Sequence, residues 1–297
     1  MERLFYERFD EEQRKRLQRL EGEPGLWWLL FCNANRLVDP NWDREVIVGL
    51  MEEEWELRER GRKADWRGAL SLWIEWHERH GALLENEAAA LQSIIRRCRS
   101  PESCEEAFRV TDDVRQLLSL IMLGAFARIG LLVEEGLAIC HEQRTGERGD
   151  RHLLDDLVAE PESHSPGRCA FERYLMRARN WLTSCDGDEV SWNEFASRVM
   201  PRRISESGRP EEDLRRGLNV WRAGINQPKP ASLRQLTANL AQEGAGADSE
   251  GIANELLWSA HLAVATDRCR AILPANMGGL VPEAVRRQRV QIAKWLP

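Results

Sequence analysis

Apolar residues recur along almost the whole chain with the spacing of one face of an α-helix, and runs in which apolar and polar residues alternate are rare. Between Leu4 and Leu20, for example, leucines and phenylalanines fall mainly on one helical face, and charged residues cover the other. Gly22 and Pro24 are expected to end this helix. The pattern therefore predicts an all-α fold.

The same spacing predicts further helices in the N-terminal half, over residues 26–37, 41–60 and 64–80. Asp65 is expected to cap the last of these, because its side chain can accept a hydrogen bond from a free backbone N–H of the first turn. Trp66, Leu70 and Trp73 then lie on neighbouring turns of one face and are expected to pack inward.

Two polar signals mark expected helix starts before the most apolar part of the chain. Ser103 followed by Glu106 matches a capping box, and Thr111 followed by two aspartates gives an acidic first turn. The apolar run over 117–133 falls short of the ~20 residues that a bilayer requires, and it contains Arg128. It is expected to be a buried core helix, and no membrane contact is predicted.

The helical pattern loosens after Cys140. The stretch 146–165 is rich in glycine, proline and charge, which predicts a linker or surface loop, and the wider segment 143–167 is expected to be protease-sensitive. This divides the chain into a multi-helix, tryptophan-rich N-terminal domain or bundle over 1–145 and a smaller helical C-terminal domain over 166–297.

Composition fits a folded protein of the cytoplasm. The chain has 297 residues, of which 42% are hydrophobic and 31% charged, unlike the composition of disordered chains. Its start, MERLFYERFD, carries charges that interrupt any apolar run, so no signal peptide is predicted. The seven cysteines are an odd number without a Cys-x-x-Cys pair, which favours buried thiols in a reducing compartment.

One segment, LRRGLNVWRAGINQPKPASLRQLTANLA over residues 214–241, has a motif of its own. It contains W-x-x-G from Trp221 to Gly224, prolines at 228 and 230, and leucines at 233, 236 and 240. This segment resembles the later helices of the helix-turn-helix domains of the Cro and phage-repressor type, in which the helix before the glycine lies in the major groove of DNA.

The resemblance implies a nucleic-acid-binding face made of Arg215, Arg216, Asn219 and Arg222, with Leu218 and Trp221 packed inward; Lys229, in the turn, joins the predicted contact residues. The family also has two further helices joined by a tight turn before the recognition helix. Residues 202–213 show no clear helical pattern for the second of these.

Local charge agrees with this interpretation. From Arg198 to Arg234 the chain has nine basic and four acidic residues, so this stretch carries 9 − 4 = +5 within a chain of net charge −7. Such a basic region is the electrostatic signature of phosphate contact. The alternative is a solvated face of a protein rich in arginine, since 42 − 4 = 38 of the 42 basic residues are arginines. The basic residues of the stretch are Arg198, Arg202, Arg203, Arg209, Arg215, Arg216, Arg222, Lys229 and Arg234.

Other candidate sites are incomplete. His77 and His80 are three residues apart and could share a helical face, but no further metal ligands accompany them, so no metal is predicted. Cys140 and His141 are adjacent, and on a helix adjacent side chains point about 100° apart, which does not suit a nucleophile and its base. No P-loop, G-x-S-x-G or G-x-G-x-x-G motif is present, so no cofactor is expected and an enzyme is less favoured.

Tryptophan is unusually abundant. Seven of the twelve tryptophans fall in the first 80 residues, where they are expected to anchor helix packing, and any exposed subset would mark a protein-partner site. These seven are Trp27, Trp28, Trp42, Trp55, Trp66, Trp73 and Trp76.

The sequence thus predicts a cytoplasmic helical regulator that contacts duplex DNA through its C-terminal part. The alternative is a protein-interaction module, such as an adaptor or sensor, without nucleic-acid binding.

Overall fold

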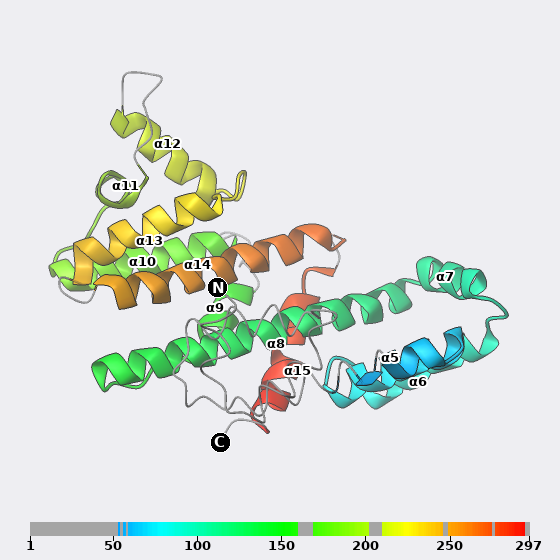
Figure 1. Cartoon of the computed structure of the whole chain (residues 1–297). Coiled ribbons are helices and arrows are strands. Elements are labelled where there is room, and N and C mark those ends of the chain that lie inside the picture. The colour runs from blue at the N-terminus through cyan, green and yellow to red at the C-terminus, as the bar shows by residue number, and fades with distance from the viewer. Residues whose placement is uncertain are drawn as a thin grey trace. The chain divides into compact units, whose positions relative to one another are not determined.

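The computed structural model describes residues 53, 56–57, 59–159, 169–201, 210–245, 249–274 and 277–294. Within these residues the secondary structure consists of helices, with no strands, which confirms the all-α prediction (Figure 1). The helices expected over 4–20 and 26–37, and most of the one expected over 41–60, lie outside the described residues, as do Trp27, Trp28, Trp42 and Trp55.

The chain divides into two compact units. Unit 1 comprises Met1–Gly149 together with Gly279–Pro297, and unit 2 comprises Asp150–Gly278. Unit 1 contains α5 (Trp66–Arg79), α6 (Glu85–Arg97), α7 (Pro101–Val110), α8 (Asp112–Thr145) and α15 (Leu280–Ile292). Unit 2 contains α9 (Leu153–Val158), α10 (Ala170–Asp186), α11 (Trp192–Val199), α12 (Pro210–Arg222), α13 (Pro230–Ala245) and α14 (Ser249–Ile272).

The return of α15 to unit 1 differs from the division expected from the sequence. A boundary at 146–165 assigns residues 280–292 to the C-terminal domain, whereas α15 packs along α8. Packing explains the difference, because Val281, Val285 and Ile292 are buried. An amphipathic helix joins whichever unit covers its apolar stripe, and sequence order does not reveal which unit that is.

Helix starts in unit 1 follow local capping chemistry. Asp65 caps α5 as predicted, since its Oδ1 accepts a hydrogen bond from the Gly68 N–H at 2.8 Å. The expected capping box was placed one turn too late. Ser100 is the N-cap of α7 and exchanges hydrogen bonds with Ser103, while Pro101 occupies the first turn, where a missing N–H costs nothing.

The long helix α8 forms the core of unit 1, as the apolar run predicted. Sixteen of its 34 residues are buried. Among the described residues it is the helix long and apolar enough to cross a membrane, with a mean hydropathy of 1.9 in its most apolar window. Since 61% of that window is buried inside the protein, as in the core helix of a folded domain, this is weak evidence for a membrane span.

The segment predicted to be a linker contains a docked helix. Within 146–165, α9 buries Leu153, Leu154, Leu157 and Val158, and it packs against α10 and α14. The sequence pattern missed it because six residues are too few to show a helical period. Residues 160–168 lie outside the described part of the chain.

Two arginines hold the end of α9 in place. The guanidinium of Arg173 on α10 donates to the carbonyl of Asp156 at 2.8 Å, and Arg270 on α14 donates to those of Val158 and Ala159. These carbonyls have no partner within their own helix, so the arginines satisfy the exposed C-terminal end of α9.

Candidate nucleic-acid interface

Helix α12 carries the residues predicted to contact DNA. It begins at Pro210 with three acidic residues in its first turn, which suits the positive end of the helix dipole. Leu218 and Trp221 are buried, 1% and 8% exposed, as predicted for the inward face. The remaining face of this helix is therefore free to carry polar residues.

Gly224 ends this helix in the manner that the W-x-x-G pattern predicts. Its φ of +68° lies in the left-handed region that glycine adopts without strain. Its N–H donates to the Trp221 carbonyl at 3.1 Å, and the next N–H, of Ile225, donates to the Val220 carbonyl at 3.2 Å. This pair of bonds is a Schellman cap, which directs the chain into the turn before α13.

Three of the predicted contact residues form one exposed stripe. Arg215, Arg216 and Asn219 are all exposed, and Asn219 follows the two adjacent arginines by four and three residues, which places it one turn further along the same side of the helix. They lie in one open depression of the surface, lined by Glu212, Arg215, Arg216, Asn219, Val220, Ala223 and Ile225. The structure thus brings together these three residues.

Arg222 does not belong to this stripe, because its side chain contacts residues within unit 2. Its Nη2 donates to Oε1 of the buried Glu172 at 3.0 Å, and its guanidinium lies 4.0 Å from the ring centre of Trp192. Only 23% of its side chain is exposed. Arg222 therefore ties α12 to α10 and α11, and its charge is already paired.

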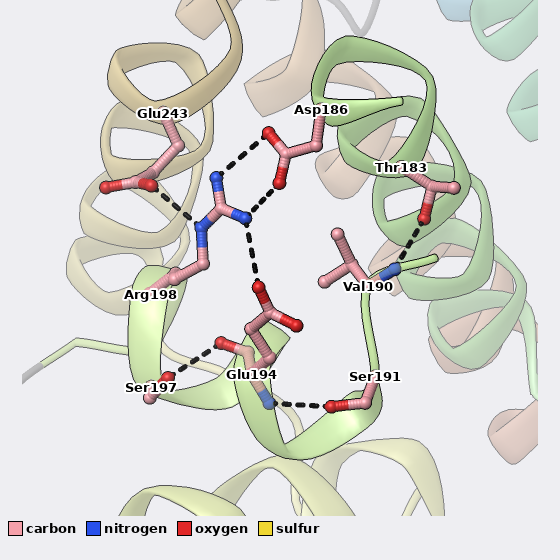
Figure 2. A network of polar contacts seen from close by, with 8 residues as sticks. All are labelled: Thr183, Asp186, Val190, Ser191, Glu194, Ser197, Arg198 and Glu243. Atoms are coloured by element: carbon pink, nitrogen blue, oxygen red, sulfur yellow. Dashed lines mark hydrogen bonds and ion pairs between the residues drawn. The ribbon is translucent and has the colours of Figure 1, made fainter. Parts of the chain in front are cut away.

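Arg198 is likewise removed from the basic region that sequence counting assigned to 198–234. Its guanidinium is bound by Asp186, by Glu243 at 2.8 Å and by Glu194 at 3.5 Å, so three carboxylates from α10, α13 and α11 surround one cation (Figure 2). These hydrogen bonds raise the pKa of Arg198 above its usual value. This arginine fastens three helices together and carries no free charge to a partner.

The turn and helix after α12 match the rest of the predicted pattern. Lys229 is exposed at the start of α13, while the three leucines of L-x-x-L-x-x-x-L are buried on its inner face. These are Leu233, Leu236 and Leu240. Helices α12 and α13 thus each have an apolar inner side and a polar outer side.

The connection before α12 departs from a helix-turn-helix. Helix α11 ends at Val199 and packs against both α12 and α13. Residues 200–209, ten in number, separate it from α12. A helix-turn-helix joins its two helices by a turn of about three or four residues. The residues Arg202, Arg203 and Arg209 of this connection lie outside the described part of the chain.

The histidines considered as metal ligands lie in the core of unit 1. His77 and His80 are 8% and 4% exposed, and burial, followed by the charge of Arg128, lowers the pKa of each to about 3. His80 Nε2 lies 2.7 Å from a carboxylate oxygen of Glu53. Within the described residues, no group of three or more histidine, cysteine or acidic side chains could hold a metal ion.

Neither does the described part of the chain show an activated thiol. Burial raises the pKa of Cys104, Cys169 and Cys269 to about 11, which disfavours the nucleophilic thiolate. His141, beside Cys140, instead has its Nδ1 within 3.2 Å of Arg144 Nη2.

Sequence reasoning missed the contribution of α14 beside the turn that joins α12 to α13. Arg268 is exposed, and its Nε donates to Oε1 of Gln227 in the turn at 2.8 Å, although the two residues are 41 positions apart. His261 lies on the same helix, and burial, followed by the charges of Arg234 and Arg268, lowers its pKa. No local motif marks these residues, because they meet through the pairing of α13 with α14.

Comparisons of the chain with models of known protein families, with curated proteins and with solved structures gave no match.

Proposed function

We propose that unit 2 contacts duplex nucleic acid through the exposed stripe of α12, with Lys229 of the following turn as a further phosphate contact, and that the protein acts as a cytoplasmic regulator. The observation that carries the proposal is the placement of Arg215, Arg216 and Asn219 on consecutive turns of one open face. Arg222, which the sequence pattern included, is left out of the contact set.

The chemistry of the stripe suits this partner. Arginine can donate two parallel hydrogen bonds to a phosphate or to the edge of guanine, and asparagine can bind the edge of adenine in the same way. A helix about 10–12 Å across fits the major groove. The three side chains therefore combine charge for affinity with donors for reading bases.

The state of the charges supports the proposal further. Within the described residues, Arg215, Arg216 and Lys229 form no ion pair. Arg198 and Arg222, by contrast, are both bound by carboxylates. Unpaired cations are the ones that can replace condensed counterions on a phosphate backbone.

A second candidate function, a protein-interaction module, is favoured by the apolar half of the same depression. Val220 and Ala223 line it, and Ile225 is 71% exposed at its end. Glu212 lines it as well, which a protein surface with a basic residue would accommodate better than a phosphate backbone. A partner helix would pack its apolar residues on Ile225 and its acidic residues on the arginines.

The test is the salt dependence of duplex binding by the full chain. Changing Arg215 and Arg216 together to Gln should weaken binding and flatten the slope of log affinity against log salt by about 1.8, since each phosphate contact contributes about 0.9. The matched control changes Arg96 and Arg97, two exposed arginines of α6 in unit 1, and should leave the slope unchanged.

Two results would refute nucleic-acid contact at this stripe: absence of salt-dependent binding by the unaltered chain, or an unchanged slope in the α12 double variant. A Ile225→Ser variant separates the two functions. It should preserve the salt slope for duplex, whereas it should weaken an apolar protein contact at the same depression.

A further inference from the structure

Helices α13 and α14 form an antiparallel hairpin, which places two arginines and a histidine on one side of it. Only residues 246–248 separate the helices, and they run side by side in opposite directions (Figure 1). Arg234 is eleven residues before the end of α13, and eleven residues into α14 is Ala260, the neighbour of His261. Arg234 and His261 are therefore level with each other along the hairpin.

The same register places the turn beside the second half of α14. Gln227 is eighteen residues before the end of α13, and eighteen residues into α14 is Asp267, the neighbour of Arg268. The hydrogen bond from Arg268 Nε to Gln227 Oε1, at 2.8 Å, confirms that they meet. This bond uses one N–H of the guanidinium and leaves the fork of its two terminal nitrogens pointing away from that contact.

The charges in this cluster are not neutralised by neighbouring carboxylates. Within the described residues, neither Arg234 nor Arg268 forms an ion pair, and both are exposed. The nearby carboxylate of Asp267 is committed elsewhere, because its two oxygens accept the N–H groups of Ala170 and Phe171 at the start of α10. The cations of Arg234 and Arg268 are thus available to an external anion.

His261 gives the cluster a third donor. It is half-buried, with the ring of Trp258 packed against it at 6.0 Å between ring centres. Burial, followed by the charges of the two arginines, holds its pKa below the ordinary value, so the imidazole is neutral at pH 7 and carries one N–H donor. A neutral histidine near two guanidinium groups can donate to an anion without adding repulsion between cations.

We infer that Arg234, Arg268 and His261 form a phosphate-binding site, with the two guanidinium groups as the charged ligands and the imidazole as an additional donor. A phosphate group has the charge and the several acceptor oxygens that these donors require. The group could belong to a nucleic-acid backbone or to a free polyphosphate. The site does not depend on the α12 stripe, because it is built from α13 and α14.

The test follows the ring resonances of the six histidines of the full chain during titration with inorganic tripolyphosphate. The resonances of His261 should move and saturate, while those of the core residues His77 and His80 should remain in place. Changing Arg234 and Arg268 together to Gln should weaken the apparent affinity at least tenfold. The Arg96/Arg97 double variant, which removes the same net charge from unit 1, should bind as the unaltered chain does.

Thermal unfolding of the Arg234/Arg268 variant should be unchanged, because both side chains are exposed, so a loss of binding would not reflect a loss of fold. Failure of tripolyphosphate to move the His261 resonances, or equal binding by the Arg234/Arg268 variant and the unaltered chain, would overturn the site whatever the chain does with DNA.

A duplex titration distinguishes the two sources of phosphate. If the site contacts a nucleic-acid backbone, the Arg234/Arg268 variant should flatten the salt slope by about 1.8. If tripolyphosphate saturates the site and duplex does not bind the chain, the proposed function at α12 fails while the phosphate site stands, with free polyphosphate as its ligand.

Discussion

Replacing Arg222 by alanine should destabilise unit 2, in contrast to what a DNA-contacting arginine would do. The substitution leaves the carboxylate of Glu172, whose side chain is 9% exposed, without the guanidinium that binds it at 3.0 Å. It also removes the cation from the face of Trp192, 4.0 Å from the ring centre. Both contacts join α12 to neighbouring helices, α10 and α11, so their loss weakens the packing of α12 in unit 2.

The size of the effect follows from these two contacts. Removing one partner of a fully buried ion pair costs about 3–5 kcal/mol. Arg222 retains 23% exposure, so water can partly solvate Glu172 after the change, and about 2 kcal/mol is expected for this part. A partly desolvated cation over tryptophan adds about 1 kcal/mol. The free energy of unfolding should therefore fall by about 3 kcal/mol.

Hydrogen exchange of the α10, α11 and α12 amides, read by mass spectrometry, measures this loss within unit 2 even if unit 1 unfolds separately. Arg215→Ala is the matched control on the same helix and should cost less than about 0.5 kcal/mol, because that side chain is exposed. A cycle with Glu172→Gln should give a coupling energy of about 1–3 kcal/mol. Equal exchange in the Arg222→Ala and Arg215→Ala variants would refute the reasoning and return Arg222 to the candidate interface.

Three further outcomes are expected. Unit 1 should lose stability as pH falls from about 6.5 toward 3, because burial lowers the pKa of His77 to about 3 and the unfolded chain therefore takes up the proton first. The free energy of unfolding lost through this residue should reach about 2 kcal/mol at pH 5. His77→Phe should remove that part of the pH dependence. Arg128→Met should lower the free energy of unfolding, measured in urea, by about 2 kcal/mol, since it leaves Gln288 Oε1 buried without its 2.7 Å donor while Gln288 still donates to the His80 carbonyl; an unchanged free energy of unfolding would exclude that cause. Gly224→Ala should lower the free energy of unfolding by about 1 kcal/mol, because the φ of +68° at that position strains a residue with a side chain. Gly224→Asn should lower it by less. An equal loss in the two variants would show that conformational strain is not responsible.

Local chemistry made much of the fold predictable. The caps at Asp65 and Gly224 and the buried leucines of α13 depend on residues a few positions apart, so their pattern is visible in the sequence. The short helix α9 was missed because its stability depends on packing against α10 and α14 and on carbonyl contacts from Arg173 and Arg270, which come from distant parts of the chain.

The candidate site was predictable to the extent that one helix determines it. The spacing of Arg215, Arg216 and Asn219 fixed their common face as soon as α12 was expected. Arg222 is three residues from Asn219, yet its side chain reaches Glu172, which is 50 positions away. The helical period gives the approximate direction of a side chain, but the partner that it meets depends on tertiary packing.

The net charge of residues 198–234 in the sequence differs from the charge that this part of the protein exposes, because tertiary packing decides which arginines are paired. The +5 of residues 198–234 includes Arg198 and Arg222, whose neutralising carboxylates include Asp186, Glu243 and Glu172, all outside that stretch. It also omits Arg268, which the α13–α14 hairpin brings to the turn.

Among the residues that the structure describes, the cations without an ion pair on this part of unit 2 are Arg215, Arg216, Lys229, Arg234 and Arg268. If all five contacted one duplex, the salt slope would be about 4.5, since each contact contributes about 0.9. The α12 stripe with Lys229 alone would give about 2.7. The slope of the unaltered chain therefore reports whether the α12 stripe and the α13–α14 cluster act as one surface, and a slope near the lower value would assign the phosphate site to a ligand other than the duplex.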